Sequence, residues 1–183
     1  MSKVLTFSTQ FPSYHPKKGD YTYFVEKFLK SKKIEYNYCV HEHSLHSFWS
    51  LNRGKEELVD DFIKFKFSDP FDFEPKNHTI RAGKRFKEGD YFSPRIWSGR
   101  PYFSKTITIA PDTEIFYAPK IEIYKTSEII IDGKFYATFG TEKSRELAKN
   151  DGLFEEDLKN WFKYPKNDLL DFQIICWNKD LKY

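Results

Sequence analysis

Hydrophobic and polar residues alternate in short runs along most of the chain after residue 71, as they do in strands that bury one face. Turn residues separate these runs, and the Asp132-Gly133 pair between two of them predicts a tight β-hairpin. Strands are predicted at residues 91–97, 103–110, 114–117, 121–124, 128–131, 135–138 and 171–177. Many short strands with frequent turns are typical of a barrel or a sandwich.

Apolar residues recur at helical spacing elsewhere in the chain. Asp20 is the expected N-cap of the first such segment, and Gly152 is the expected left-handed residue that ends the third. The predicted helices are residues 21–33, 53–67, 144–151 and 155–162. Near the N-terminus, residues 3–8 predict a strand, and residues 34–40 predict a second extended segment.

No internal repeat or low-complexity linker divides these elements. The chain of 183 residues is long enough to bury a hydrophobic core as one domain. The order of elements therefore predicts a single α+β domain over residues 1–183. We expect a mixed β-barrel at residues 71–177 with flanking helices, preceded by an N-terminal α/β elaboration at residues 1–70.

Aromatic residues make up 19% of the chain, with 19 Phe and 12 Tyr. Such side chains fill cores and favour strands, and they also stack on nucleic-acid bases. The formal net charge is only +3. Any surface that binds nucleic acid must therefore be local, since the overall charge does not indicate one.

Cys39 and Cys176 stand far apart and show no zinc-binding spacing, so both are expected to be reduced. His41 and His43 would share one face of a strand, a geometry that metals use, but no further ligands accompany them at suitable spacing. We therefore predict no metal and no cofactor. The sequence has no signal peptide and no run of apolar residues that would span a membrane, so we expect a cytoplasmic protein with no membrane partner.

The stretch with the most distinctive chemistry has the spacing Lys76-x-x-Thr79-x-Arg81. In an extended segment, Thr79 and Arg81 point to the same side, with Lys76 just upstream after Pro75. A cation, a hydroxyl and a guanidinium could then share one cleft. The alternative is an ordinary basic strand edge at the protein surface.

This motif resembles that of the ASCH domains of the PUA-like superfamily. It is followed by Arg85-Phe86-Lys87-x-Gly89-Asp90, a turn that leads into an apolar strand. The nearest variant is the small bacterial acetylcytidine amidohydrolases, and the resemblance covers roughly residues 73–177. Downstream, Leu147-Ala148-x-x-Asp151-Gly152 is similar to the helix in which those enzymes have a catalytic acid, although they have Glu where this chain has Asp151.

The resemblance implies a PUA-like barrel and a catalytic role for Lys76, Thr79 and Asp151. Thr79, or a water that it positions, would attack the exocyclic amide of an acylated nucleobase. Lys76 would act as base or stabilise the oxyanion, and Asp151 would hold a proton. The Asn-Asp-Gly run that contains Asp151 is also simply a good helix ending. The implied partner is RNA or a modified nucleoside, and the candidate substrate-binding residues are Arg81, His78, Arg85, Lys87, Trp97 and Tyr102.

Two other functions remain open from the sequence. A non-catalytic module could hold RNA or a modified base in a groove beside the barrel, where cations alternate with aromatic residues between positions 85 and 105. That alternation would also arise in any strand whose aromatic side chains point inward. A ribonuclease is the third alternative, with His78 or His15 as general acid or base.

Overall fold

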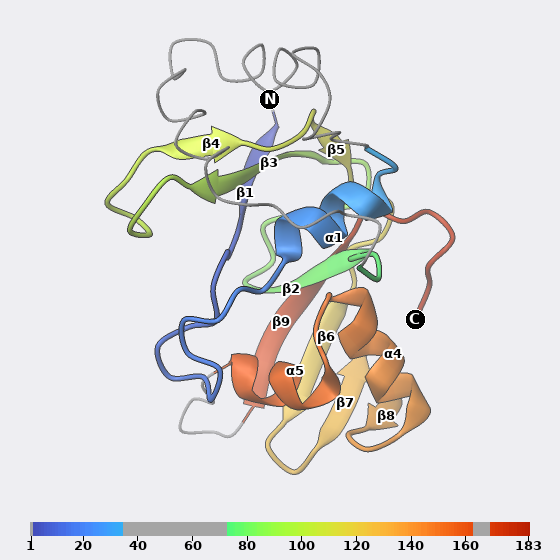
Figure 1. The fold of residues 1–183 in the computed structure, drawn as a ribbon. Coiled ribbons are helices and arrows are strands. Elements are labelled where there is room, and N and C mark those ends of the chain that lie inside the picture. Colours follow the sequence, from blue (N-terminus) through green and yellow to red (C-terminus); the bar gives the residue numbers. More distant parts are fainter. Residues whose placement is uncertain (1, 35–72, 163–168) are drawn as a thin grey trace.

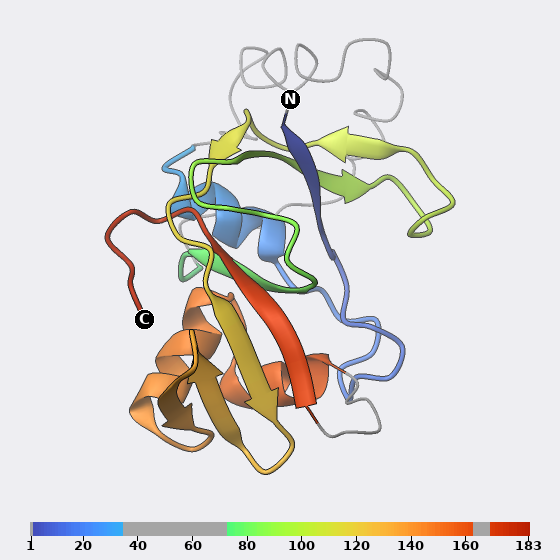
Figure 2. The same cartoon turned by 180° about the vertical axis from the view of Figure 1, so that it is seen from behind.

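The computed structural model describes residues 2–34, 73–162 and 169–183, and it has three helices and two mostly antiparallel sheets in these ranges (Figures 1 and 2). The predicted α+β class is confirmed. Several predicted features lie outside the described residues: Cys39, His41, His43, the helix at residues 53–67 and all but the first residue of the segment at 34–40.

The first sheet has four strands and is built around β3 (Tyr91–Trp97). The N-terminal strand β1 (Lys3–Phe7) runs parallel to β3. The short strands β4 (Thr106–Thr108) and β5 (Thr113–Glu114) pair with β3 in antiparallel orientation. The predicted strand at residues 103–110 is thus shortened to its middle, because residues 100–104 form a turn in which Phe103 N and Ser104 N donate to Arg100 O.

The second sheet has five strands in the order β2-β9-β6-β7-β8, and every neighbouring pair is antiparallel. Its strands are β2 (His78–Ala82), β6 (Lys120–Tyr124), β7 (Glu128–Ile131), β8 (Lys134–Thr138) and β9 (Leu169–Cys176). The predicted hairpin at Asp132-Gly133 is confirmed. Both residues have positive φ, 48° and 74°, as a two-residue hairpin turn of type I′ requires.

The expected closed barrel is not present among the described residues, which form two separate sheets. The second sheet is open, with β2 and β8 as its two edge strands. The outer edge of β2 is occupied by a side chain instead of a strand, since Ile80 N donates to the Asp151 carboxylate at 3.2 Å. A satisfied edge group removes one reason for a further strand to pair there.

The helices of the described residues are α1 (Phe24–Ser31), α4 (Glu142–Asn150) and α5 (Glu155–Trp161). None of these described helices is long and apolar enough to cross a membrane. The predicted cap at Asp20 is wrong. Thr22 N donates to Thr9 O at 3.1 Å and the Thr22 hydroxyl donates to Ser8 O at 2.6 Å, so the chain stays extended until Tyr23, the actual N-cap. At α4, a capping box between Thr141 and Ser144 starts the helix two residues before the predicted position.

Aromatic side chains join the two sheets. Helix α1 lies between the first sheet and β2 (Figure 1), and its Phe28 contacts Phe7 of β1 and Trp177 at ring-centroid distances of 5.0 and 5.2 Å. Phe92 of β3 lies 5.6 Å from the same Trp177. These rings are buried, so the core accounts for part of the high aromatic content of the chain.

Candidate functional site

Lys76 is entirely buried, an unusual position for a lysine. Its backbone is held from both sides, since Lys76 N donates to Lys27 O at 2.9 Å and Trp177 Nε1 donates to Lys76 O at 3.0 Å. The amine lies 4.2 Å from the centre of the Phe24 ring, which provides a cation–π contact. Helix α1 therefore covers the amine, and the residues on both sides of the Lys76 backbone fix where the side chain enters the core.

Asp151 is the ionic partner of Lys76. It is the C-cap of α4 and is 2% exposed, and its Oδ1 accepts from Lys76 Nζ at 2.7 Å. The same oxygen accepts from Ile80 N at 3.2 Å, and Lys76 Nζ also donates to the Asp151 backbone carbonyl. One carboxylate oxygen thus connects the end of α4, the buried amine and the edge of β2. Lys76 and Asp151, two of the residues with an implied catalytic role, thus lie in direct contact.

Gly152 permits this close approach of α4 to Lys76. Its φ is +76°, and an added Cβ would lie 3.3 Å from Lys27 Cδ and 3.4 Å from Lys76 Cβ and Cδ. Lys27 Nζ donates to Gly152 O at 2.7 Å, so α1 holds this turn directly. The predicted role of Gly152 as the left-handed end of α4 is confirmed, and the glycine also leaves the space that Lys76 occupies.

We expect Gly152→Ala to lower the free energy of unfolding by about 2 kcal/mol, because a left-handed alanine costs about 1–2 kcal/mol and the new methyl group also crowds Lys76 and Lys27. Urea denaturation measures the loss. Gly89→Ala is the matched control, since Gly89 has a similar φ of +80° but no atom within 4 Å of the added Cβ. Equal losses in the two variants would mean that the close approach at Gly152 has no energetic importance.

Thr79 and Arg81 lie in β2, where strand alternation directs both to the same side as predicted. Thr79 is 3% exposed, and its hydroxyl forms no hydrogen bond with another described residue. Thr79 directly precedes Ile80, whose N–H binds the Asp151 oxygen that Lys76 also binds. The hydroxyl is therefore on a residue adjacent to the ion pair.

Arg81 is half-buried and bridges the two sheets, because its Nη2 donates to Thr6 O of β1 at 2.7 Å. Its Nε is buried and has no hydrogen-bond partner in the structure as described. A buried guanidinium donor without a partner is costly in a folded protein and frequently indicates a place for a ligand or a water. Arg81 thus provides a donor for a negatively charged or carbonyl oxygen.

Burial and charge set the protonation of the site. Burial lowers the pKa of Lys76 to about 8, the positive charges of Arg81 and Lys27 lower it as well, and the attraction of Asp151 limits the shift. Burial raises the pKa of Asp151, and the nearby Lys76 and Arg81 oppose that shift. A lysine amine with this pKa is neutral in an appreciable fraction of molecules near neutral pH, which a general base requires.

Tyr102 and Trp97 lie on the β3–β4 hairpin of the first sheet, and Arg81 of β2 contacts that sheet. Burial lowers the pKa of Arg81, and the charges of Asp151 and Tyr102 oppose that shift. The ring centroids of Tyr102 and Trp97 are 5.4 Å apart. Two of the predicted substrate-binding residues thus lie beside each other, Trp97 at the end of β3 and Tyr102 in the turn that follows. Arg81 reaches the same sheet through Thr6 of β1, which pairs with Arg95 of β3.

His78 is not part of this group. It alternates with Thr79 in β2, so its ring points to the opposite side, where it is buried and hydrogen-bonded through Nδ1 to the Tyr183 hydroxyl. Burial lowers its pKa well below the usual value, which keeps the ring neutral. His15 is also buried, with Nε2 3.2 Å from Asp157 O. We therefore propose neither histidine as the acid or base of a nuclease.

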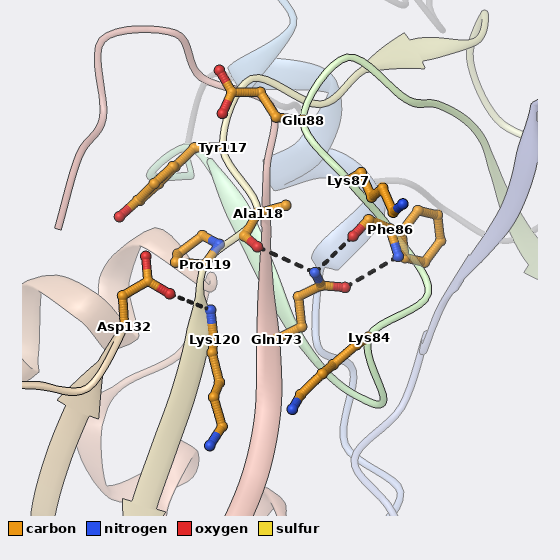
Figure 3. Close-up of a pocket in the computed structure, with 10 residues that line it drawn as sticks. All are labelled: Lys84, Phe86, Lys87, Glu88, Tyr117, Ala118, Pro119, Lys120, Asp132 and Gln173. Carbon is orange, nitrogen blue, oxygen red and sulfur yellow. Dashed lines mark hydrogen bonds between the residues drawn. The ribbon is translucent and has the colours of Figure 1, made fainter.

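Arg85 and Lys87 also lie apart from the ion pair. Arg85 Nη2 donates to Val4 O at 2.7 Å, and Lys87 lines a separate pocket of about 450 Å³ (Figure 3). Gln173 forms part of that pocket, and its amide binds both the N–H and the carbonyl of Phe86. Because lysines alternate with Glu88 and Asp132 around this pocket, its charge favours no single class of ligand.

Sequence reasoning did not find the residues that surround Lys76, which come from α1 and from the position just after β9. Phe24 belongs to the predicted apolar stripe of α1, which is a signal for burial but not for contact with a lysine. Lys27 and Trp177 meet Lys76 only through long-range packing, and no local pattern predicts that. No group of three or more His, Cys, Asp or Glu side chains suited to a metal ion occurs within residues 2–34, 73–162 and 169–183.

No protein-family model, curated protein or solved structure matches this chain. Its function is therefore inferred from the arrangement of Lys76, Asp151, Thr79 and Arg81.

Proposed function

We propose that this protein hydrolyses the amide of an N-acylated nucleobase, with Thr79 as nucleophile, Lys76 as general base and Asp151 as the carboxylate that holds the Lys76 amine. The observation that carries this proposal is the buried contact of 2.7 Å between Lys76 Nζ and Asp151 Oδ1. The same Asp151 oxygen accepts from Ile80 N, so the ion pair lies beside Thr79, the residue before Ile80. A buried lysine with its pKa lowered to about 8 is suited to proton transfer. The resemblance of the Lys76-x-x-Thr79-x-Arg81 run to the ASCH motif, and the PUA-like relationship that it implies, support the same assignment.

The reaction would begin when the neutral Lys76 amine accepts the proton of the Thr79 hydroxyl and Oγ1 attacks the acyl carbonyl carbon. When the tetrahedral intermediate collapses, the C–N bond breaks and Lys76 returns the proton to the exocyclic nitrogen of the base. Water then hydrolyses the Thr79 ester by the same proton transfers, which releases the carboxylic acid and restores the hydroxyl. Asp151 stabilises the ammonium that Lys76 becomes between these transfers.

Arg81 has a suitable donor for the oxyanion of that intermediate. Its Nε is buried and lacks a partner among the described residues, and its charge interacts with Asp151. A donor fixed before the reaction needs no reorganisation when negative charge develops, which is why such donors stabilise transition states strongly. Trp97 and Tyr102 provide aromatic surface near Arg81 for the base itself.

The proposal is tested by measuring acid release from a panel of N-acylated nucleosides, with N-acetylcytidine first. Turnover that depends on Lys76 and Thr79 would support it. A protein that binds such a nucleoside but releases no acid from any member of the panel would instead be a non-catalytic binding module. The resemblance would then apply to binding alone.

The kcat/KM for the preferred substrate is expected to rise with pH through about 8, because the base is active only when Lys76 has lost its proton. Arg81→Gln removes a positive charge that lowers the pKa of Lys76, so the rise should move to higher pH in that variant. A pH–rate series of both proteins measures the shift. A flat profile between pH 7 and 9, or a midpoint that Arg81→Gln leaves unchanged, would exclude Lys76 as the base.

A further inference from the structure

The hairpin between β3 and β4 exposes two large aromatic side chains at its tip. Tyr102 is 86% exposed and Phe103 is 77% exposed, and the hairpin protrudes from the first sheet (Figures 1 and 2). Exposing a ring of this size to water forgoes the stability that its burial would provide. A neighbouring pair of such rings at a protruding tip indicates a surface that binds another molecule.

The charged residues of the chain segment that contains these rings are all of one sign. Residues 91–111 contain no Asp or Glu, whereas Arg95, Arg100 and Lys105 all lie in this range. The Arg100 guanidinium lies 4.4 Å from the centre of the Phe103 ring, and both Arg100 and Lys105 are exposed. Cations interleaved with exposed aromatic rings suit a partner that has both negative charge and flat π-faces.

Hydrogen bonds hold the tip in one shape. The Ser104 hydroxyl accepts from Gly99 N and donates to Arg100 O, both at 3.0 Å, and the Ser98 hydroxyl donates to Lys105 O at 2.9 Å. Tyr102 has a φ of +67°, a conformation that favours glycine and costs a tyrosine about 1–2 kcal/mol. The strained residue thus presents a large ring to solvent where glycine would be more stable, which is consistent with a role for that ring.

The tip is also linked to the proposed site. Tyr102 contacts Trp97 of β3, and Arg81 Nη2 donates to Thr6 O of β1, the residue that pairs with Arg95 of the same strand β3. A base held at Arg81 would therefore have neighbours in a strand that reach the rings of Tyr102 and Phe103. A free nucleoside has no such neighbours and would leave the tip without a partner.

We propose that the β3–β4 hairpin binds single-stranded nucleic acid, with bases stacked on Tyr102 and Phe103 and phosphates contacted by Arg100 and Lys105. The bound species is a single strand because the faces of paired bases are stacked on one another inside a duplex. The inference rests on the proposed function, which it extends by making the substrate a modified base within a polynucleotide.

The test uses the full chain and unmodified fluorescein-labelled ribo- and deoxyribonucleotide decamers, so that binding is measured without turnover. Tyr102→Ala and Phe103→Ala should each weaken binding by on the order of tenfold, the usual effect of losing one stacking platform. Arg100→Gln should reduce the slope of log affinity against log salt by about 0.7, the value for one phosphate contact to a single strand. Fluorescence anisotropy at several salt concentrations gives both quantities.

Phe154→Ala is the matched control. Phe154 is also 77% exposed and also has a cation near its ring, Lys17 Nζ at 5.4 Å, but it lies at the start of α5 away from the hairpin. This variant should bind the decamers as the wild type does. The pattern of tip variants weakened and Phe154→Ala unchanged supports the inference, and the decamer that binds more tightly identifies RNA or DNA as the partner.

Two results would overturn the inference. The first is a wild-type protein that does not bind either decamer, or tip variants that bind as tightly as Phe154→Ala. The second is loss of self-association in the tip variants, measured by sedimentation, with decamer binding unchanged, since the rings would then be a protein interface. Hydrolysis is measured on N-acylated nucleosides and binding on unmodified decamers, so loss of hydrolysis and loss of strand binding are separate outcomes.

Discussion

Thr79→Val is expected to lower kcat for an N-acylated nucleoside by on the order of a thousandfold or more, because the variant lacks the attacking oxygen and groups that act as a unit lose most of their rate together. Its stability should change little. The Thr79 hydroxyl has no hydrogen bond with another described residue, so its removal leaves no partner unsatisfied. Steady-state acid release and thermal unfolding, measured on the same sample, give both results.

Two further variants separate the chemistry of Thr79 from its position. Thr79→Ser keeps a hydroxyl at the same position and should retain measurable turnover. Thr113→Val is the structural control, because Thr113 has the same 3% exposure but its hydroxyl donates to Pro111 O at 3.2 Å, outside the site. It should lose some stability and no activity. Normal turnover in Thr79→Val would show that a water or another group is the nucleophile.

The part of the site that lies in one strand could be predicted from the sequence. Strand alternation directs Thr79 and Arg81 to the same side because the side-chain period of a strand is two, whatever the strand pairs with. Gly152 was predictable for the same local reason, since the end of a helix favours a residue that tolerates positive φ. Both signals depend only on neighbours in sequence.

The rest of the site depends on contacts between distant segments. Asp151 meets Ile80 N only because α4 ends beside the edge of β2, and 71 positions separate the two residues. The same contact occupies a backbone N–H on the edge of β2, and a closed barrel would have needed this edge to pair with another strand. His78 was expected near the substrate, but the alternation that groups Thr79 with Arg81 also excludes His78 from that side.

The complete burial of Lys76 could not be predicted from the motif either. A lysine after Pro75 reads as exposed, and here it is covered by Phe24 of α1 and held by Trp177 after β9. Those segments lie 52 positions before and 101 positions after Lys76 in the chain, so only the folded structure brings them together. The burial matters for function because it lowers the pKa of the amine.

Breaking the Lys76–Asp151 pair from either side is expected to lower the free energy of unfolding by about 3–5 kcal/mol, because each single variant leaves the other buried group without its partner. Lys76→Met removes the charge at similar side-chain length. Asp151→Asn removes the opposite charge and keeps an oxygen that can accept from Ile80 N. Urea denaturation at pH 7 measures both losses, and turnover should be absent in Lys76→Met.

The double variant Lys76→Met/Asp151→Asn decides whether the pair contributes chemistry or only structure. Neither position is charged in that variant, and replacing a buried pair by neutral groups is often close to neutral for stability, so at least half of the lost stability should return. Turnover should not return, because no amine remains to accept the Thr79 proton. A double variant that regains both stability and hydrolysis would assign the pair a purely structural role. One that regains neither would mean that the amine stabilises the core through contacts other than Asp151, such as its cation–π contact with Phe24.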